Sequence, residues 1–200
     1  MLILSLDTTG SILSLALLEE EKVLAEQNEP LERGQAEFLM PLIQTLMTKT
    51  GKEMADLDAV AVCTGPGSFT GVRIGLAGAR AFGLALDIPV WGVTAFEAAC
   101  LDQKEPCVVA LDTKRDDYYV AFMDEKGDFK QEPSVMTAED LRSYLPFKAI
   151  GDGALNLSSK IGCSIARPRF SSSVAVGKLA FKRRSGQPVP FYLRDADVTL

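Results

Sequence analysis

One short segment of the sequence recurs after a fixed interval, and this repeat constrains the fold more than any other feature. Leu6-Asp7-Thr8 returns as Leu111-Asp112-Thr113, and each copy ends an apolar run that is typical of a buried strand meeting a turn. Without any gap, residues 15–19 then match residues 120–124. The repeat predicts one structural unit present twice in the chain. Chance likeness between two strand–turn–strand segments is the alternative.

The two copies share one order of expected elements. Each begins with a strand and a hairpin-like second and third strand, followed by a helix, a strand ending in glycine, and another helix. The expected helices cover residues 35–49, 70–86, 95–101, 137–145 and 173–184, and the later strands cover residues 59–63, 89–93 and 148–150. This order predicts an α/β protein with two ribonuclease-H-like lobes of the actin/sugar kinase/Hsp70-like (ASKHA) plan, divided into domains at residues 1–104 and 105–200.

Composition points to a globular chain and excludes several classes of function. Hydrophobic residues make up 47% and charged residues 24%, which is enough apolar surface for a core. The apolar start has no basic stretch before it and Asp7 directly after it, which argues against a secretory signal. No apolar run looks long enough to span a bilayer. The four cysteines form no CxxC pair, so we expect reduced thiols, a cytoplasmic location and no membrane partner.

The sequence contains no histidine, and its net charge is −6. Histidine is the commonest general base and a usual zinc ligand, so histidine-dependent catalysis is excluded and no metal site is expected. Tight binding to nucleic acid comes largely from Lys and Arg, which replace the counterions of the phosphates. We therefore expect any RNA contact to occur only with the help of a partner.

A glycine-rich segment, Gly65-Pro66-Gly67-Ser68-Phe69-Thr70-Gly71, lies between an expected strand and an expected helix. Backbone N–H groups in such a turn can bind a phosphate, aided by the helix dipole. The candidate nucleotide or phosphate ligands are Asp7, Gly65, Gly67, Ser68, Thr70 and Gly71. Alternatively, the glycines allow a sharp turn and close packing, and Ser68 or Thr70 caps the helix.

Two helices of the first copy have more apolar surface than one sheet can cover. The apolar side chains of residues 35–49 spread over an arc of roughly 200°, about twice the stripe that packs on one sheet. Residues 72–86 are apolar almost all round, with a narrow polar strip at Arg73 and Arg80. The candidate partner-binding residues are Phe38, Leu39, Leu42, Ile43, Leu46, Met47, Arg73, Ala77, Arg80 and Leu84. The alternative is that other helices of the same chain cover both faces.

The glycine-rich segment resembles the GPGSFTGxRxG signature of the TsaB (YeaZ) family and of its catalytic relative TsaD. Four further segments resemble the TsaB family, so that the likeness covers nearly the whole chain: residues 6–9, 112–119, 151–154 and 190–194. The chain departs from the family at Thr113-Lys114 and at Asp116-Asp117, which leaves the role of that loop open. At the two histidine positions of the TsaD metal motif HxxxH it has Ala95 and Ala99, which offer no donor atom.

The resemblance implies a non-catalytic accessory subunit. TsaD transfers a threonylcarbamoyl group to the adenosine 3′ of the anticodon in tRNAs that read codons beginning with A, and TsaB proteins pair with it through the two helices above. The resemblance also implies a homodimer through the same surface, TsaE as a further partner, tRNA contact only within the complex, and no cofactor of its own, with ATP or ADP at the complex interface. A basic cluster could then touch tRNA or be a solvated helix end; it comprises Lys178, Lys182, Arg183 and Arg184.

An independent enzyme is the rival class. It would be a nucleotide-dependent phosphotransferase or a metal-free peptidase-like enzyme that uses the cleft between the lobes. In the phosphotransferase, Asp7 and Asp112 would position a magnesium-bound water or a base. As turn residues, the two aspartates are equally well explained.

Overall fold

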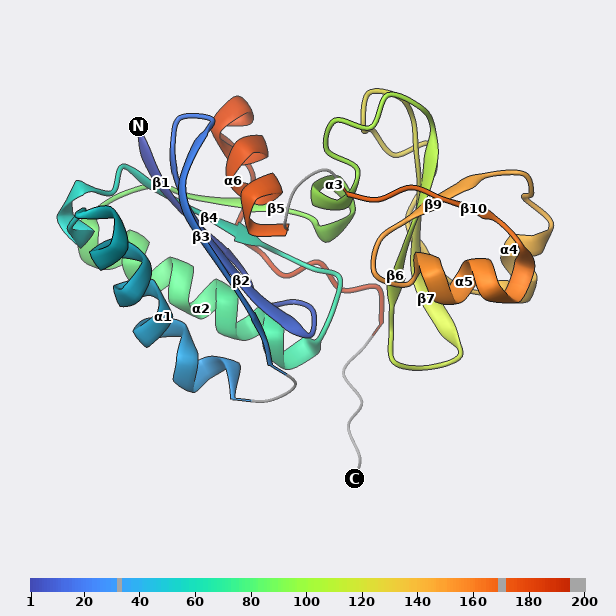
Figure 1. Cartoon of the computed structure of the whole chain (residues 1–200), viewed down its shortest axis with the longest axis horizontal. Helices are drawn as coiled ribbons and strands as arrows, with labels where there is room; N and C mark the ends of the chain where they lie inside the picture. The colour runs from blue at the N-terminus through green and yellow to red at the C-terminus, as the bar shows by residue number, and fades with distance from the viewer. Residues whose placement is uncertain (32–33, 169–171, 195–200) are drawn as a thin grey trace. The chain divides into compact units, whose positions relative to one another are not determined.

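The computed structural model describes residues 1–31, 34–168 and 172–194, and the chain forms two compact units (Figure 1). The first unit comprises residues 1–98 and 170–191, and the second comprises residues 99–169 and 192–200. Each unit is built on its own five-stranded mixed sheet.

The two sheets have the same strand order, as the sequence repeat predicts. The first sheet has the order β3-β2-β1-β4-β5, formed by β1 (Leu2–Asp7), β2 (Ile12–Glu19), β3 (Lys22–Pro30), β4 (Ala59–Cys63) and β5 (Val90–Val93). The second has the order β8-β7-β6-β9-β10, formed by β6 (Cys107–Asp112), β7 (Asp117–Met123), β8 (Ser134–Thr137), β9 (Lys148–Ile150) and β10 (Ser164–Ile165). In both, three antiparallel strands lead into parallel ones.

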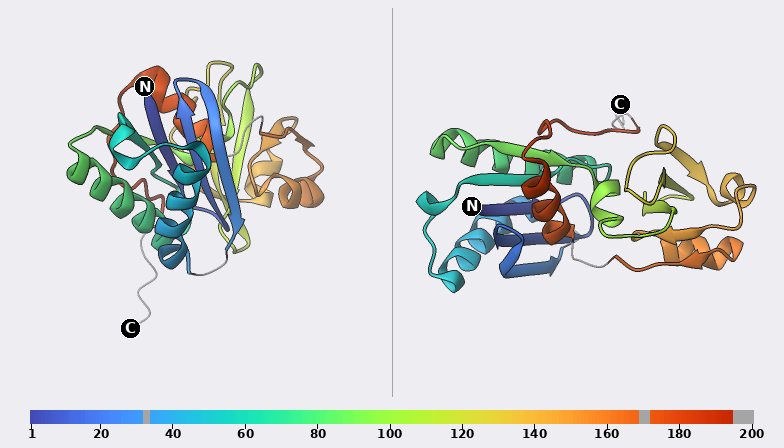
Figure 2. Two further views of the ribbon diagram at one scale, coloured as in Figure 1. Left: turned by 60° about the vertical axis from the view of Figure 1, so that its left-hand side comes forward. Right: turned by 90° about the horizontal axis from the view of Figure 1, so that it is seen from above.

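Helices cover both faces of the first sheet (Figures 1 and 2). On one face lie α1 (Gln35–Thr50) and α2 (Phe69–Leu86), whose apolar side chains form the main core with alternate residues of β1, β2 and β4. On the other face lies α6 (Ser172–Arg183), where Val174 packs with Ala16 and Leu18. A 3-10 turn (Met54–Asp56) precedes β4, and α3 (Ala95–Ala99) follows β5.

The position of α6 corrects the predicted domain limits. The division into residues 1–104 and 105–200 assigns the last helix to the second lobe, whereas α6 belongs to the first unit. Its start is fixed there by the Ser173 hydroxyl, which lies 2.7 Å from Ser14 Oγ, and by the Ser173 carbonyl, which accepts from Ser5 Oγ at 2.7 Å. In the second unit, the helix after the glycine turn is instead α5 (Ala154–Ile161), which the sequence analysis does not predict.

The second unit has a smaller core on one face of its sheet. Two short helices, α4 (Ala138–Arg142) and α5, contribute buried side chains that pack against β6, β7 and β9. Thr137 caps α4 by accepting from Asp140 N–H, and the Asp140 carboxylate accepts from Thr137 N–H in return.

Strand pairing shows that the gap-free alignment of the two copies is wrong by one residue. In the first hairpin Leu6 pairs with Leu15, but in the second hairpin the counterpart of Leu15, Val120, pairs with Ala110. Ala110 and Val120 also face the core of their unit, as Leu6 and Leu15 do. The counterpart of Asp7 is therefore Leu111, and Asp112 lies one position further along. The predicted equivalence of the two aspartates is wrong.

One helix among the described residues, α2, has the length and composition of a membrane span. Its mean hydropathy is 1.2 over 18 residues, and 28% of that window is buried. The sequence analysis expects no apolar run of that length, whereas α2 passes this test by length and composition. The signal is weak, because core helices of proteins that never enter a membrane pass the same test, and one side of α2 packs on β4.

Candidate partner-binding surface

Helix α1 has a buried side and an exposed side, and the sequence-based list of surface residues mixes the two. Four of its predicted partner-binding residues are core residues: Leu39, Ile43, Leu46 and Met47 are each at most 4% exposed. They recur at helical spacing and pack against the sheet and α2. Their assignment to a partner surface is wrong, because the sheet of this chain already covers them.

The remaining predicted residues are exposed, except for Leu42, which is half-buried and packs against the core, and we call this set the α1/α2 face. It consists of Phe38, Leu42, Arg73, Ala77, Arg80 and Leu84. Helices α1 and α2 lie side by side on the same face of the sheet, so that these residues come from adjacent helices (Figure 2). Leu84 is 88% exposed and Phe38 is 47% exposed.

The outward side of α2 presents the small side chain of Ala77 between two arginines, followed by the exposed Leu84. The outward residues follow one another at helical spacing: Arg73, Ala77, Arg80 and Leu84. The opposite side of the helix carries Val72, Leu76 and Ala79, which are buried in the core. The Arg73 guanidinium lies over the Phe69 ring, 3.8 Å from its centroid. Small side chains at this spacing let a second helix approach closely, as ridges fit into grooves.

The glycine-rich turn fits against the loop that follows β1. A Cβ on Gly67 would lie 2.4 Å from the Thr9 carbonyl oxygen, and a Cβ on Gly71 would lie 2.0 Å from the Thr8 carbonyl oxygen. Ser68 caps α2 by accepting from Gly71 N–H at 3.2 Å, and its own N–H donates to the Thr9 carbonyl at 2.7 Å. These contacts correspond to the packing and capping alternative for the motif.

The other predicted phosphate ligands are Asp7, Gly65 and Thr70, and the Asp7 carboxylate already accepts two hydrogen bonds. Asp7 is buried, and its Oδ1 accepts from Thr9 N–H at 2.8 Å and from Thr9 Oγ1 at 2.7 Å. Gly65 has φ +100°, and a Cβ there would lie 2.9 Å from the Phe191 carbonyl oxygen. Thr70 is exposed on the first turn of α2. Phosphate binding by this set stays a prediction.

The buried thiol beneath the turn is held protonated. Burial raises the pKa of Cys63 well above its usual value, and the Asp7 carboxylate adds to the effect. Its Sγ lies 3.7 Å from Thr9 Oγ1. A thiol in this environment is a poor nucleophile, because the thiolate is the reactive form.

The loop between β6 and β7, which departs from the family pattern, is held by hydrogen bonds within its own unit. Lys114 donates to Asp112 through both its N–H and Nζ, each at 2.8 Å, and Thr113 Oγ1 donates to Asp117 Oδ1 at 2.7 Å. Arg194 donates to Asp117 Oδ2. These bonds fix the loop and do not assign it a function.

A carboxyl with a raised pKa lies in the glycine turn of the second unit, on a residue that is exposed overall. Asp152 Oδ1 accepts from Asp112 N–H at 2.9 Å. Burial raises the pKa of Asp152, and the negative charge of Asp112 raises it further. The flanking Gly151, whose Cβ would lie 2.5 Å from the Ala110 carbonyl oxygen, allows the turn to pass close to β6.

The basic cluster of α6 is engaged within the first unit. Lys178 Nζ donates to the Glu21 carbonyl at 2.7 Å, and Lys182 Nζ lies 3.6 Å from Glu21 Oε2. Arg184 lies over the Phe181 ring at 5.2 Å, while Arg183 pairs with Glu97. These contacts are typical of a basic helix end at the surface and indicate no RNA site.

Among the described residues, no group of three or more His, Cys, Asp or Glu side chains could hold a metal ion. Ala95 and Ala99, which stand at the two histidine positions of the TsaD metal motif, lie on α3.

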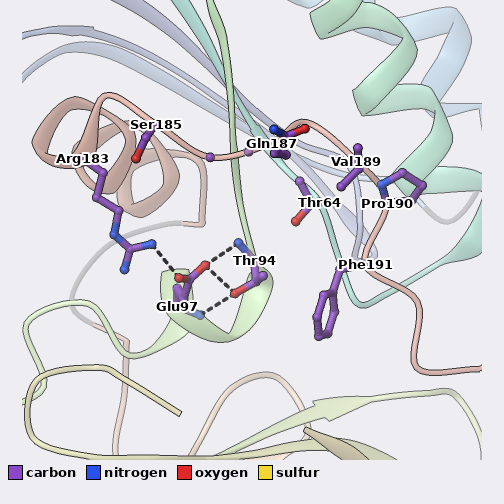
Figure 3. A pocket seen from close by; sticks show the side chains of 11 residues that line it. Thr64, Thr94, Glu97, Arg183, Ser185, Gln187, Val189, Pro190 and Phe191 are labelled. Atoms are coloured by element: carbon purple, nitrogen blue, oxygen red, sulfur yellow. Dashed lines mark hydrogen bonds and ion pairs between the residues drawn. The ribbon is translucent and has the colours of Figure 1, made fainter. Parts of the chain in front are cut away.

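A cavity of about 280 Å³ lies between β5, α3 and the segment after α6 (Figure 3). Glu97 is at its wall, where Thr94 N–H and Oγ1 donate to Oε2 at 2.8 and 2.7 Å and Arg183 donates to Oε1 at 2.6 Å. Burial opposes ionisation of Glu97, but the bonds from Thr94 and Arg183 outweigh it and lower the pKa. This cavity is not predicted from the sequence. The one local signal is the run Ser185-Gly186-Gln187-Pro188-Val189-Pro190, which is typical of a segment that forms neither a helix nor an inner strand.

Two units with one strand order, and helices on both faces of the first sheet, give the chain a fold of the ASKHA plan, which confirms the predicted fold. The family model described as "TsaD: tRNA N6-adenosine threonylcarbamoyltransferase" matches residues 23–143. The chain belongs to this family, and the predicted resemblance to TsaB (YeaZ) is confirmed by the similar proteins of known name.

Three similar proteins illustrate the relationship. An uncharacterized protein of Mycobacterium tuberculosis is 32% identical over 199 residues, 98% of this chain and 92% of the relative. The tRNA threonylcarbamoyladenosine biosynthesis protein TsaB of Bacillus subtilis is 38% identical over 97 residues, which are 48% of this chain and 42% of that protein. YeaZ from Pseudomonas aeruginosa is 24% identical, with a TM-score of 0.78 over 96% of this chain and 99% of that one, which shows the shared fold.

Proposed function

We propose that this chain acts in tRNA threonylcarbamoyladenosine biosynthesis as a non-catalytic subunit that binds and activates a TsaD-type threonylcarbamoyltransferase. The observation that carries the proposal is the exposed α1/α2 face, with Leu84 88% exposed on a helix whose composition is apolar. Water disfavours such a surface, and a partner helix that packs on it would gain the free energy of apolar burial. A homodimer through the same face competes for this surface.

Activation follows if the chain binds one arrangement of the transferase better than the others. A partner shifts a conformational equilibrium by as much as its affinity differs between the states. The chain then needs no catalytic group and no cofactor of its own. In this proposal ATP or ADP binds at the interface of the complex, TsaE joins the assembly, tRNA is contacted only within it, and the protein works in the cytoplasm.

The docking surface is tested by placing a charge in its centre. We expect Leu84→Asp to weaken binding to TsaD by at least about tenfold, because an interface core tolerates no unpaired charge. Leu155→Asp is the matched control, since Leu155 is 73% exposed on α5 of the second unit and is not a residue of the α1/α2 face. Titration calorimetry with purified TsaD gives the affinities, and thermal unfolding shows that both variants remain folded. Equal binding by the two variants would refute this surface.

The biochemical role is tested by reconstitution. Threonylcarbamoyl transfer to tRNA is measured with TsaD, TsaE, the enzyme that forms threonylcarbamoyl-adenylate, ATP, threonine and bicarbonate, with and without this chain. We expect transfer to require the chain and the chain alone to be inactive. Transfer that is indifferent to the chain would overturn the proposal. Hydrolysis or transfer of phosphate by the chain alone would instead favour the independent phosphotransferase.

A further inference from the structure

The segment that follows α6 runs along the outer edge of β5, and we call residues 185–191 the strap (Figure 3). Gly92 N–H donates to the Gly186 carbonyl at 3.2 Å, and Phe191 N–H donates to the Thr64 carbonyl at 2.8 Å. Because β5 is the last strand of its sheet, its outer edge would otherwise be open to pairing. The strap therefore covers an exposed sheet edge.

The strap approaches β5 closely but is held at few points. A Cβ on residue 186 would lie 2.2 Å from the Gly92 carbonyl oxygen, so that only glycine permits the contact. Pro188 and Pro190 have no N–H to donate, and most residues of the strap are exposed. A segment with few hydrogen bonds and little burial opens at low free energy.

One of the few points that hold the strap is a residue of the α1/α2 face. The Arg80 guanidinium, which is exposed on α2, donates to the Pro188 carbonyl. A guanidinium carries five N–H donors, and the bond to the Pro188 carbonyl uses one of them. Because Arg80 is exposed, its remaining donors can bind a carboxylate in bidentate geometry.

We propose that the strap positions Arg80 for an acidic side chain of the docked partner, so that strap closure and partner docking reinforce each other. This inference rests on the proposed function. An arginine already held by Pro188 loses less conformational freedom when a carboxylate binds it, which raises affinity. Linkage then requires the reverse effect: the bound partner holds Arg80 in place and stabilises the closed strap.

The hydrogen bond from Arg80 to the strap is tested first in the free chain. Amide hydrogen exchange is followed by NMR at Gly92 and Phe191, the two N–H groups that join the strap to the sheet region. We expect Arg80→Ala to speed exchange at both amides several-fold. Arg142→Ala, which removes an arginine paired with Glu139 on α4, should leave both rates unchanged. Unaltered rates in Arg80→Ala would overturn the inference.

The coupling is tested with the partner present. A double variant, Pro188→Gly with Pro190→Gly, loosens the strap and leaves every residue of the α1/α2 face in place. We expect it to bind TsaD several-fold more weakly than the wild type, and we expect bound TsaD to slow exchange at Gly92 and Phe191 in the wild type. Wild-type affinity in the double variant, or faster exchange on binding, would overturn the inference while the proposed function stands. Absence of binding by the wild type would refute the proposed function and the coupling together.

Discussion

The hydroxyl of Thr8 donates a hydrogen bond to the carbonyl of Gly71 over 2.6 Å, while the carbonyl oxygen of Thr8 lies 2.0 Å from the place that a Cβ on residue 71 would take. The loop after β1 and the first turn of α2 are therefore in direct contact. Two parts of the family signature, at the start of the chain and at residues 65–75, meet here. The contact explains their residue types without a bound phosphate.

Gly71→Ala should destabilise the protein strongly. A methyl group at this position meets backbone, which cannot move aside as a flexible side chain can, and overpacking of this kind costs about 3 kcal/mol. Urea unfolding measures the change. Gly10→Ala is the control, since a Cβ there meets only the Ile12 nitrogen at 4.0 Å. If Gly71→Ala unfolds at the same urea concentration as Gly10→Ala, close packing against Thr8 does not explain the glycine at residue 71.

Replacements on the buried and exposed sides of α1 should lower the free energy of unfolding by different amounts. Ile43 is fully buried between the sheet and α2, so Ile43→Ala should lower the free energy of unfolding by about 2–5 kcal/mol. Phe38→Ala removes a side chain that is about half exposed and should change it by less than about 1 kcal/mol. Chemical denaturation of both variants gives the values. Similar losses in both would contradict the assignment of these two sides.

The helices and strands were largely predictable from local patterns, because each type of element has its own spacing of apolar residues along the chain. The bounds of β4 and β9 agree with the sequence prediction, and α1 and α2 agree to within one residue at each end. What the patterns could not give is which surface each apolar side meets. A helical wheel shows that α1 is apolar over a wide arc, but not that the sheet and α2 cover Leu39 and Ile43 while Phe38 stays outside.

Two errors have the same physical origin, since both concern contacts between residues far apart in sequence. The apolar residues of α6 do not by themselves indicate which sheet they cover, and the hydrogen bonds of Ser173 with Ser5 and Ser14 hold the helix on the first. The repeated Leu-Asp-Thr motif suggested that Asp7 and Asp112 are equivalent, but one extra residue in the second hairpin shifts the pairing of Ala110. Strand register depends on pairing that no local motif specifies.

Asp152→Asn should stabilise the protein at neutral pH. Burial and the nearby Asp112 raise the pKa of Asp152, so that the folded state keeps its proton to higher pH than the unfolded state does. Wild-type stability therefore falls as pH rises from the unfolded value near 3.8 through the folded pKa, and the deficit persists above it. The asparagine retains the oxygen that accepts from Asp112 N–H and carries no charge. Urea unfolding at pH 7 should show a higher midpoint for the variant, and a lower midpoint would contradict the interpretation.

Glu97→Gln should have the opposite pH dependence. The pKa of Glu97 is lowered, since the bonds from Thr94 and Arg183 outweigh the burial of the carboxyl, and the folded state therefore favours the ionised form. The stabilisation is fully present above the unfolded value near 4.5 and is lost as pH falls through the folded pKa. The variant should thus be less stable than the wild type at pH 7, and the difference should shrink in urea unfolding series taken below pH 4.5.

The control for Glu97 is a second glutamate that pairs with an arginine at the surface. Glu139 lies 3.0 Å from Arg142, but its side chain is 79% exposed, and exposed pairs contribute about 0–1 kcal/mol. Glu139→Gln should therefore change stability little at any pH. If the difference in stability between Glu97→Gln and the wild type stays constant from pH 7 to below 4.5, the carboxylate charge is not the cause of that difference. In that case the pairing with Arg183 would contribute by shape and packing alone.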